Sequence, residues 1–339
     1  MCVTIDITTQ FVDVAEEIGE MPLIDMPLDA LKSYMGTNPR PDDFDAYWDA
    51  GLTALDRTEP DITLAPANFL SKSADCFHLT FTGVGGARVY AKYLRPIGIT
   101  APGPAILMFH GYTASSGDWS DKLAYVSQGF SVLAMDCRGQ GGQSTDPGGV
   151  TGNTLSGHII RGLADAPERL YYRNVYLDTV QLARIAGQLP NVDASRIGVL
   201  GGSQGGALTL ACAALHPAIR KAAPTYPFLC DFQRVWEMDL AKGAYEELAT
   251  FFRRFDPRHE RIDQWFERLG YIDIQHLAPR VEADILMPIG LMDAICPPST
   301  QMAAYNKITS KKELLIYPDF GHEHLPQAND IVFNFMSDL

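Results

Sequence analysis

A serine between glycines is the clearest candidate for a reactive group in this sequence. The segment Gly201-Gly202-Ser203-Gln204-Gly205 follows a short apolar run, residues 197–200, and precedes a stretch with helical spacing. A strand, a G-x-S-x-G turn and a helix together form a nucleophile elbow, in which the serine backbone is strained and glycines prevent clashes. The helix that follows directs its free N–H groups at the serine. The pattern predicts a nucleophilic Ser203; the alternative is a glycine-rich turn with an incidental serine.

A serine hydroxyl needs a base that accepts its proton, and that base is usually a histidine oriented by a carboxylate. On folds with this elbow the carboxylate and the histidine follow the serine in that order. Asp293 ends the apolar run 283–293, and His322 comes directly after the run that begins at residue 312. These positions predict a triad of Ser203, Asp293 and His322. Three alternatives remain: His324 is the base, Asp293 begins a turn, or His322 is a surface loop histidine.

An ester carbonyl that is attacked by serine needs two N–H donors for its developing negative charge. One is expected from Gln204, the residue after the nucleophile, and the other from Tyr112 in the loop after an early strand. Tyr112, Pro227 and Phe228 are expected to line the acyl side of the substrate site, which would favour acetyl over longer acyl groups. His110, two residues before Tyr112, is expected to be a packed structural histidine.

Metal and nucleotide chemistry find little support in the sequence. His322-Glu323-His324 lacks the spacing of an H-E-x-x-H motif and has no evident third ligand. Two glycine-rich segments, GVGGAR and RGQGGQS, depart from G-x-G-x-x-G, and no G-x-x-x-x-G-K-[ST] motif occurs. We therefore expect neither a metal nor a cofactor.

The elements that would position these residues alternate between strand and helix. Short runs that are apolar on both faces, separated by helical stretches, are typical of a parallel sheet buried on both sides. Such a pattern predicts an open, mostly parallel α/β sheet with a helical insertion at about 231–281 before the strand that carries Asp293. Together with the elbow and the order of Ser203, Asp293 and His322, it indicates the α/β-hydrolase fold. Strands are expected in 76–84, 87–96, 104–111, 130–139, 196–203, 283–293 and 312–322; helices in 41–57, 174–189, after Ser203, and in 233–255 and 258–273.

Composition narrows the class of protein further. The 339 residues carry a formal net charge of −14, which argues against nucleic-acid binding and against anionic membrane surfaces. No apolar stretch approaches the roughly 18 residues of a membrane span, and the N-terminus does not resemble a signal peptide. The six cysteines form no C-x-x-C pair, so we expect reduced thiols and a cytoplasmic protein. We expect one domain over 21–339, preceded by an acidic extension over 1–20.

With these residues identified, the chain resembles the acetyl xylan esterase / cephalosporin-C deacetylase family, carbohydrate esterase family seven, from about residue 21 to the C-terminus. The family's Arg-Gly-Gln motif matches Arg138-Gly139-Gln140, its Gly-x-Ser-Gln-Gly motif matches residues 201–205, and its His-Glu motif matches His322-Glu323. Longer similar stretches are KSYMGTNPRPDDFDAYW, HGYTASSGDW, HIIRGLADAPERLYYRNVYLDTV and GLMDAICPPSTQMAAYN. Arg138 is expected to hold its loop through an ion pair rather than to bind substrate.

The resemblance implies a metal-free serine esterase. It would remove acetyl groups from short xylo-oligosaccharides and from cephalosporin C through an acetyl-enzyme. Ser203 would be the nucleophile, His322 the base, and Asp293 the orienting carboxylate. The partners would be a small acetylated saccharide or antibiotic, and five further copies in a homohexamer, a dimer of trimers with its active sites facing an inner cavity. A serine peptidase, or a non-catalytic binding protein on the same fold, are the alternatives.

Overall fold

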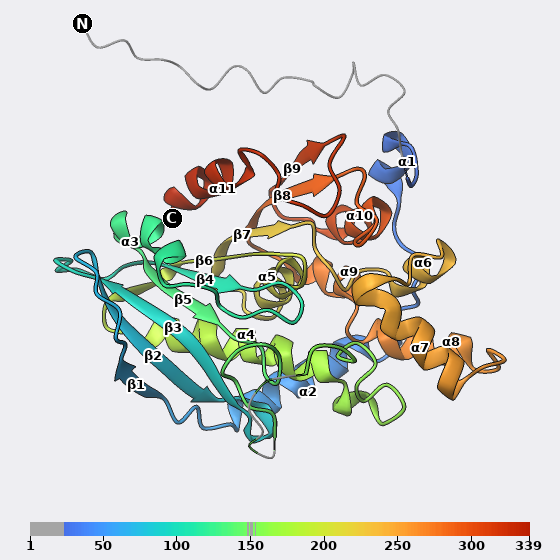
Figure 1. The fold of residues 1–339 in the computed structure, drawn as a ribbon, viewed down its shortest axis with the longest axis horizontal. Coiled ribbons are helices and arrows are strands. Elements are labelled where there is room, and N and C mark those ends of the chain that lie inside the picture. The colour runs from blue at the N-terminus through green and yellow to red at the C-terminus, as the bar shows by residue number, and fades with distance from the viewer. Residues whose placement is uncertain (1–23, 148, 150–151, 153) are drawn as a thin grey trace, which may run out of the picture.

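The computed structural model describes residues 24–147, 149, 152 and 154–339. These residues form one nine-stranded sheet with helices around it (Figure 1). The strand order is β1-β2-β3-β5-β4-β6-β7-β8-β9. The first three strands are antiparallel and the other six are parallel to one another. The strands are β1 Thr63–Pro66, β2 Ala74–Thr82, β3 Arg88–Pro96, β4 Gly103–Phe109, β5 Ser131–Met135, β6 Val192–Gly202, β7 Ile219–Thr225, β8 Asp284–Gly290 and β9 Lys312–Tyr317. The acidic extension 1–20 and Cys2 lie outside the described residues.

Helices cover both faces of this sheet (Figure 1). α3 packs on β3 and β5, and α11 on β8, whereas α4 and α5 pack on β6. The α-helices are α1 Leu28–Ser33, α2 Phe44–Asp56, α3 Leu123–Ser127, α4 Tyr171–Gln188, α5 Gln204–Leu215, α6 Phe232–Glu237, α7 Glu246–Phe255, α8 Ile262–Gly270, α9 Ile274–Leu277, α10 Pro298–Lys307 and α11 Ala328–Ser337. This arrangement confirms the predicted α/β-hydrolase architecture. None of the helices within the described ranges has the length and apolar character needed to cross a membrane.

The central strands are apolar on both faces because both faces are buried. In β4, Leu107 and Phe109 belong to the core that also contains α4 and α5, whereas Ile106 belongs to a second core beneath α3 and α11. Side chains of successive strand residues point to opposite faces, so a strand between two helical layers needs apolar residues at every position. This explains why the apolar runs show no alternation in the sequence.

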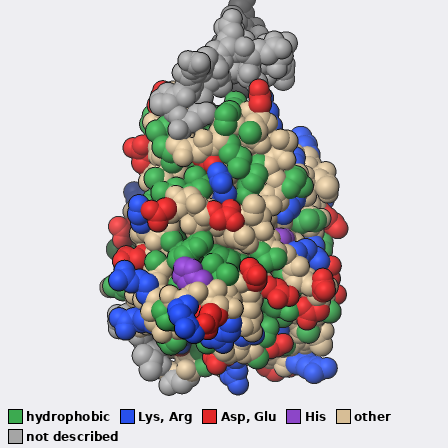
Figure 2. All heavy atoms as spheres, turned by 90° about the vertical axis from the view of Figure 1, so that its right-hand side faces the viewer, with side chains coloured by type: hydrophobic (Ala, Val, Ile, Leu, Met, Phe, Trp, Pro, Cys, Tyr) green, Lys and Arg blue, Asp and Glu red, His purple; other side chains and the backbone are tan. Residues whose placement is uncertain are grey.

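The helical insertion lies between β7 and β8, and it is more broken than the sequence suggests. The helix expected over 233–255 is interrupted: α6 ends at Glu237, and α7 begins only at Glu246. Asp239 and Gly243 adopt left-handed φ values of 56° and 55°, which a continuous right-handed helix does not allow. α6, α7 and α8 project at the right of Figure 1, and Figure 2 shows acidic and basic side chains interspersed over this face.

A buried carboxylate joins the insertion to the N-terminal part of the domain. Asp231 is fully buried and accepts hydrogen bonds from the hydroxyl of Tyr34 at 2.7 Å and from the N–H of Asn38 at 2.8 Å. The N–H of Asp231 donates in turn to the carboxylate of Asp273 at 3.0 Å. Buried carboxylates are costly unless they are hydrogen-bonded, so these contacts hold the segment 34–38 against the insertion.

His276 lies beside this junction, in α9. Its ring meets the ring of Phe44 edge-on at 5.8 Å, and its Nε2 lies 3.2 Å from the carbonyl oxygen of Pro39. Burial, with the positive charge of Lys307 adding to it, lowers the pKa of His276 to about 3. The imidazole is therefore neutral in the folded protein at every pH at which an exposed histidine would begin to protonate.

We expect this histidine to make the stability of the fold depend on pH. Its folded-state pKa lies below the unfolded value of about 6.5, so its stabilising contribution is complete above that pH and is lost as the pH falls through this range. Between pH 7.5 and pH 5 the wild type should lose roughly 2 kcal/mol at this position, and a His276→Gln variant should lose none. Urea denaturation of both proteins at the two pH values measures this.

The comparison uses the difference between the two proteins, because Asp273, whose pKa burial raises to about 7, titrates in both of them. The difference in unfolding free energy between wild type and His276→Gln should shrink at pH 5. A difference that stays constant with pH would contradict a neutral, buried His276.

Candidate active site

Ser203 occupies a sharp turn between β6 and α5. Its backbone has φ 58° and ψ −119°, a conformation that is costly for a residue with a side chain. Hydrogen bonds on both sides hold it: the N–H of Ser203 donates to the carbonyl of Thr225 at 3.0 Å, and its carbonyl accepts from the N–H groups of Ala207 and Phe228. The turn therefore depends on the end of β7 as well as on its own sequence.

The glycines of the elbow make room for β4. A Cβ atom on Gly201 would lie 2.5 Å from the carbonyl oxygen of Phe109, and one on Gly205 would lie 2.1 Å from the same oxygen. Both distances are far inside van der Waals contact, and the obstacle is backbone. Gly202 differs, because the nearest atom to its Cβ would be the ring of Tyr226 at 3.3 Å. Two of the three glycines are thus required by close packing against the last residue of β4.

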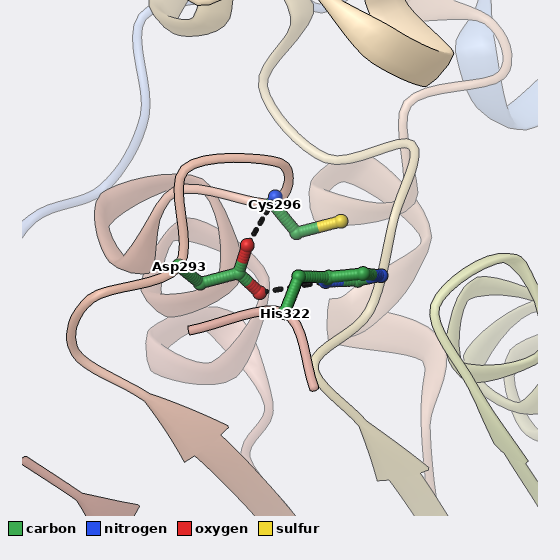
Figure 3. Close-up of side chains that lie close together, drawn as sticks. All are labelled: Asp293, Cys296 and His322. Carbon is green, nitrogen blue, oxygen red and sulfur yellow. Dashed lines mark hydrogen bonds and ion pairs between the residues drawn. The ribbon is translucent and has the colours of Figure 1, made fainter. Parts of the chain in front are cut away.

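Asp293 and His322 form a hydrogen-bonded pair at the ends of β8 and β9 (Figure 3). Nδ1 of His322 lies 2.8 Å from Oδ2 of Asp293. The other carboxylate oxygen accepts the N–H groups of Ile295 and Cys296, both at 2.8 Å, and Asp293 is fully buried. An ionised carboxylate only accepts hydrogen bonds, so Nδ1 of His322 carries the hydrogen and Nε2 is left as an acceptor.

Ser203 and His322 line the same pocket, a cavity of about 650 Å³. The ring of Tyr226 packs against that of His322 with the ring centres 4.6 Å apart, which restricts the imidazole. His324, the alternative base, is exposed and does not line this pocket. The other described lining residues are Gly111, Tyr112, Thr113, Leu155, Ser156, Gly157, Ile160, Gly243, Ala244, Glu246, Glu247, Thr250 and Ile295.

The backbone N–H groups of Tyr112, a lining residue of this pocket, and of Gln204, the residue after Ser203, are the two donors predicted for an oxyanion. Gln204 is the first residue of α5, where N–H groups have no partner within the helix. Among the described residues, none accepts a hydrogen bond from the N–H of either residue. Both N–H groups are therefore unpaired within the described part of the chain, and their role as donors to an oxyanion stays a prediction.

A buried pair of glutamine side chains connects Gln204 to the loop that contains Tyr112. Oε1 of Gln204 accepts from Nε2 of Gln140 and from the hydroxyl of Tyr172, both at 2.8 Å. Oε1 of Gln140 accepts in turn from the N–H of Thr113, the neighbour of Tyr112, at 3.0 Å. Both glutamines are fully buried. Sequence reasoning assigned Gln140 to a motif but gave it no role; its place in that motif was the only available signal.

Glu247, in α7 of the insertion, is a residue of the pocket that sequence reasoning missed. Its carboxylate accepts hydrogen bonds from the hydroxyl of Tyr112 and from the N–H of Ile159, the latter at 2.8 Å. Burial and the negative charge of Glu247 raise the pKa of Tyr112, so the phenol stays neutral and donates. An acidic residue in the first turn of a helix is common for electrostatic reasons, so no local signal marked Glu247.

Pro227 and Phe228 lie behind the pocket wall and do not line the pocket. Both are buried, and the ring of Phe228 packs against the rings of Tyr112 and Tyr245 with centres 5.7 and 4.4 Å away. The chain turns inward here because the N–H of Phe228 donates to Ser203. Of the three residues predicted to bind substrate, the structure places only Tyr112 at the pocket surface.

Two polar residues near the site have structural contacts. Nε2 of His110 accepts the N–H of Cys137 at 2.9 Å, and burial lowers the pKa of this histidine. Arg138 is 1% exposed and forms a two-pronged ion pair with Asp178, with N–O distances of 2.7 and 2.5 Å. These contacts agree with the structural roles expected for His110 and Arg138.

Asp293, Cys296 and His322 also present potential metal-ligand atoms within 4.8 Å of one another (Figure 3). The carboxylate already accepts four hydrogen bonds from its neighbours, the fourth from Nε2 of Gln301 at 3.4 Å. Burial raises the pKa of the Cys296 thiol well above its usual range, whereas a metal ligand must be a thiolate. Hydrogen bonding accounts for this cluster better than a metal site does.

The elbow, the histidine–carboxylate pair and the sheet order define an α/β-hydrolase. The model of the acetyl xylan esterase (AXE1) family matches residues 21–339, so the chain belongs to the acetyl xylan esterase family, whose members are hydrolases of ester bonds. This confirms the predicted family.

Individual relatives agree with this family. The solved structure of acetyl xylan esterase 1 from Thermoanaerobacterium sp. JW/SL YS485 is 54% identical, with a TM-score of 0.90 over 93% of this chain and 99% of that one. An acetyl xylan esterase from Paenibacillus sp. R4 is 36% identical, with a TM-score of 0.87 over 92% and 99%. Acetyl esterase Axe7A of Xylanibacter ruminicola is 27% identical over 311 residues, 88% of this chain; the match spans only 66% of that relative.

The close approach at the elbow predicts how alanine substitutions affect stability. Gly205→Ala should destabilise the fold by about 1–3 kcal/mol or more, because the added Cβ meets the backbone of β4. Gly202→Ala is the matched control and should cost less than about 1 kcal/mol. Thermal or urea unfolding measures both, and equal losses in the two variants would contradict the packing described here.

Proposed function

We propose that this protein hydrolyses acetyl esters of small acetylated saccharides, and of cephalosporin-C-like acetates, through a serine mechanism without a metal. The observation that carries the proposal is that His322, hydrogen-bonded to Asp293 through Nδ1, lines one pocket together with Ser203. This is the arrangement of nucleophile, base and orienting carboxylate in serine hydrolases. Membership of the acetyl xylan esterase family supports the choice of an acetyl ester.

In the first half of the reaction the acetyl group passes to the serine. Oγ of Ser203 attacks the carbonyl carbon while Nε2 of His322 takes the hydroxyl proton. The carbonyl electron pair moves onto the oxygen, which accepts hydrogen bonds from the N–H groups of Tyr112 and Gln204. When the carbonyl re-forms, the bond to the alcohol oxygen breaks, and His322 gives its proton to the leaving hydroxyl. Asp293 stabilises the imidazolium that exists between these two transfers.

In the second half water replaces the alcohol. His322 takes a proton from the water as its oxygen attacks the acetyl-enzyme, and the same two N–H groups stabilise the second oxyanion. Collapse of this intermediate releases acetate and returns the proton to Ser203. Each proton taken by His322 is thus given back within its own half-reaction, and no cofactor is consumed.

The charges of the pocket favour a neutral alcohol. Glu246 and Glu247 line the pocket, and the described lining residues include no lysine or arginine. A substrate with its own carboxylate would meet like charge, which weakens binding. We therefore place neutral acetylated saccharides ahead of anionic acetates such as cephalosporin C.

The assembly and the compartment are also proposals. A homohexamer, a dimer of trimers, rests on the family resemblance, and light scattering of the purified protein tests it. A cytoplasmic location rests on the cysteine pattern: the five cysteines of the described residues are free and buried, as expected where thiols stay reduced.

Alanine substitutions test the triad. Ser203→Ala, His322→Ala and Asp293→Ala should each lower kcat for p-nitrophenyl acetate by about 10⁴-fold or more. The losses should not add in double variants, because the three groups act as one unit. His324→Ala is the control and should keep wild-type activity. An inactive His324→Ala beside an active His322→Ala would assign the base to His324, and a wild type without hydrolysis would favour a binding protein.

Acyl length and substrate charge test the pocket. With Tyr112 beside the elbow and Tyr226 against His322, kcat/KM should be at least about 10-fold higher for p-nitrophenyl acetate than for the butyrate. Glu246→Gln should raise kcat/KM for an anionic acetate ester and leave that for a neutral one nearly unchanged. Equal efficiencies for acetate and butyrate would refute the acyl claim, and an unaltered ratio in Glu246→Gln would refute the charge claim.

A further inference from the structure

A second pocket, of about 450 Å³, lies at the first turn of α4, and no residue that lines it also lines the pocket of Ser203. Four of its described lining residues are arginines, in a chain whose net charge is −14. Only two of its described lining residues carry a carboxylate. Its described lining residues are Val84, Gly85, Arg138, Asp146, Pro147, Arg161, Glu168, Arg169, Tyr171, Arg173 and Asn174.

Two of the arginines are already neutralised. Arg138 is paired with Asp178, and Arg161 lies 2.6 Å from the carboxylate of Asp146. Arg169 is exposed and forms no ion pair with any described residue. The positive charge that remains available in the pocket therefore comes from Arg169 and from the fourth arginine, Arg173.

The buried guanidinium of Arg173 indicates that this pocket binds a ligand. It is only 6% exposed, yet within the described ranges no carboxylate forms an ion pair with it and no atom accepts a hydrogen bond from its Nε. Its guanidinium lies over the ring of Tyr47 at 5.2 Å, a contact that orients the cation without neutralising it. Burying a cation without an anionic partner is costly, and a bound anion would offset that cost.

The surroundings suit an anion with two or more oxygens. The planar guanidinium binds carboxylate and phosphate groups through two parallel hydrogen bonds. Glu168, Arg169, Tyr171 and Arg173 come from the entry to α4, an 18-residue helix whose N-terminal dipole also favours negative charge. The pocket combines these groups with a volume larger than one small ion requires.

We propose that this pocket is a binding site for a small molecule that carries a carboxylate or phosphate group, held by Arg173 and Arg169. The site is separate from the ester-binding pocket. Tyr171 connects the two regions, because it lines the arginine pocket and contacts Gln140. The hydroxyl of Tyr171 donates to the carbonyl of Arg138 at 2.5 Å and lies 3.2 Å from Nε2 of Gln140. Neither Arg169 nor Arg173 contacts the triad, so the site does not depend on the esterase activity.

Calorimetric titration of the full chain with inorganic phosphate and with malonate tests the proposal. At least one anion should bind saturably at one site per chain, with Kd of about 1 mM or tighter. Arg173→Gln should weaken that binding about 10-fold, and Arg169→Gln about 5-fold, since each removes a charge-assisted contact. Arg220→Gln, a substitution of an exposed arginine at the start of β7, should leave Kd unchanged.

Arg169→Gln keeps the test decisive if the buried Arg173→Gln variant fails to fold, because Arg169 is exposed. Hydrolysis of p-nitrophenyl acetate by Arg169→Gln at the wild-type rate would show that the variant is folded. A preference for phosphate or for malonate identifies the class of ligand. The proposal is overturned if neither anion binds saturably, or if Arg169→Gln and Arg220→Gln bind with the same affinity as the wild type.

Discussion

The contact between the elbow and the end of β4 is the constraint on which the rest of this site depends. The carbonyl oxygen of Phe109 lies so close to Gly201 and Gly205 that neither position tolerates a Cβ atom. This close approach has two consequences. It presents Ser203 at the carboxyl edge of the sheet, and it brings the loop that follows β4 beside the first turn of α5. Tyr112 and Gln204 therefore come from the ends of two adjacent strands, which lie side by side in the sheet.

Buried polar contacts then hold this arrangement in place. The amides of Gln140 and Gln204 have no access to water, so a shift of either loop would leave polar groups unsatisfied, at a cost of about 1–3 kcal/mol for each group. Glu247 also stabilises this arrangement, because its carboxylate accepts hydrogen bonds from the hydroxyl of Tyr112 and the N–H of Ile159 and so connects the insertion to both. The insertion is in turn attached to the N-terminal segment through Asp231. Buried hydrogen bonds thus attach the insertion both to residue 38 and to the loop of Tyr112.

The two pockets differ in the sign of the charged side chains that line them. Carboxylates from α7 line the pocket of Ser203, whereas arginines around the start of α4 line the other. Tyr171 and the Arg138–Asp178 pair lie between them, fully or almost fully shielded from water. Because low-dielectric surroundings screen charges weakly, this buried layer strengthens the interaction between the opposite charges of the two pockets.

The sequence by itself determined the fold, the family and the positions of Ser203, Asp293 and His322, because each follows an apolar run and the carboxyl ends of parallel strands meet at one edge. Glycine spacing likewise predicted the elbow, since the requirement for a missing Cβ is local. Tertiary structure alone decided that Glu247 meets Tyr112, 135 residues away in the chain, and that Phe228 packs behind the pocket. It also decided that Arg173 is buried without a carboxylate partner among the residues that the structure describes. These outcomes depend on which distant side chains are packed together, and no local pattern of residues encodes such long-range pairings.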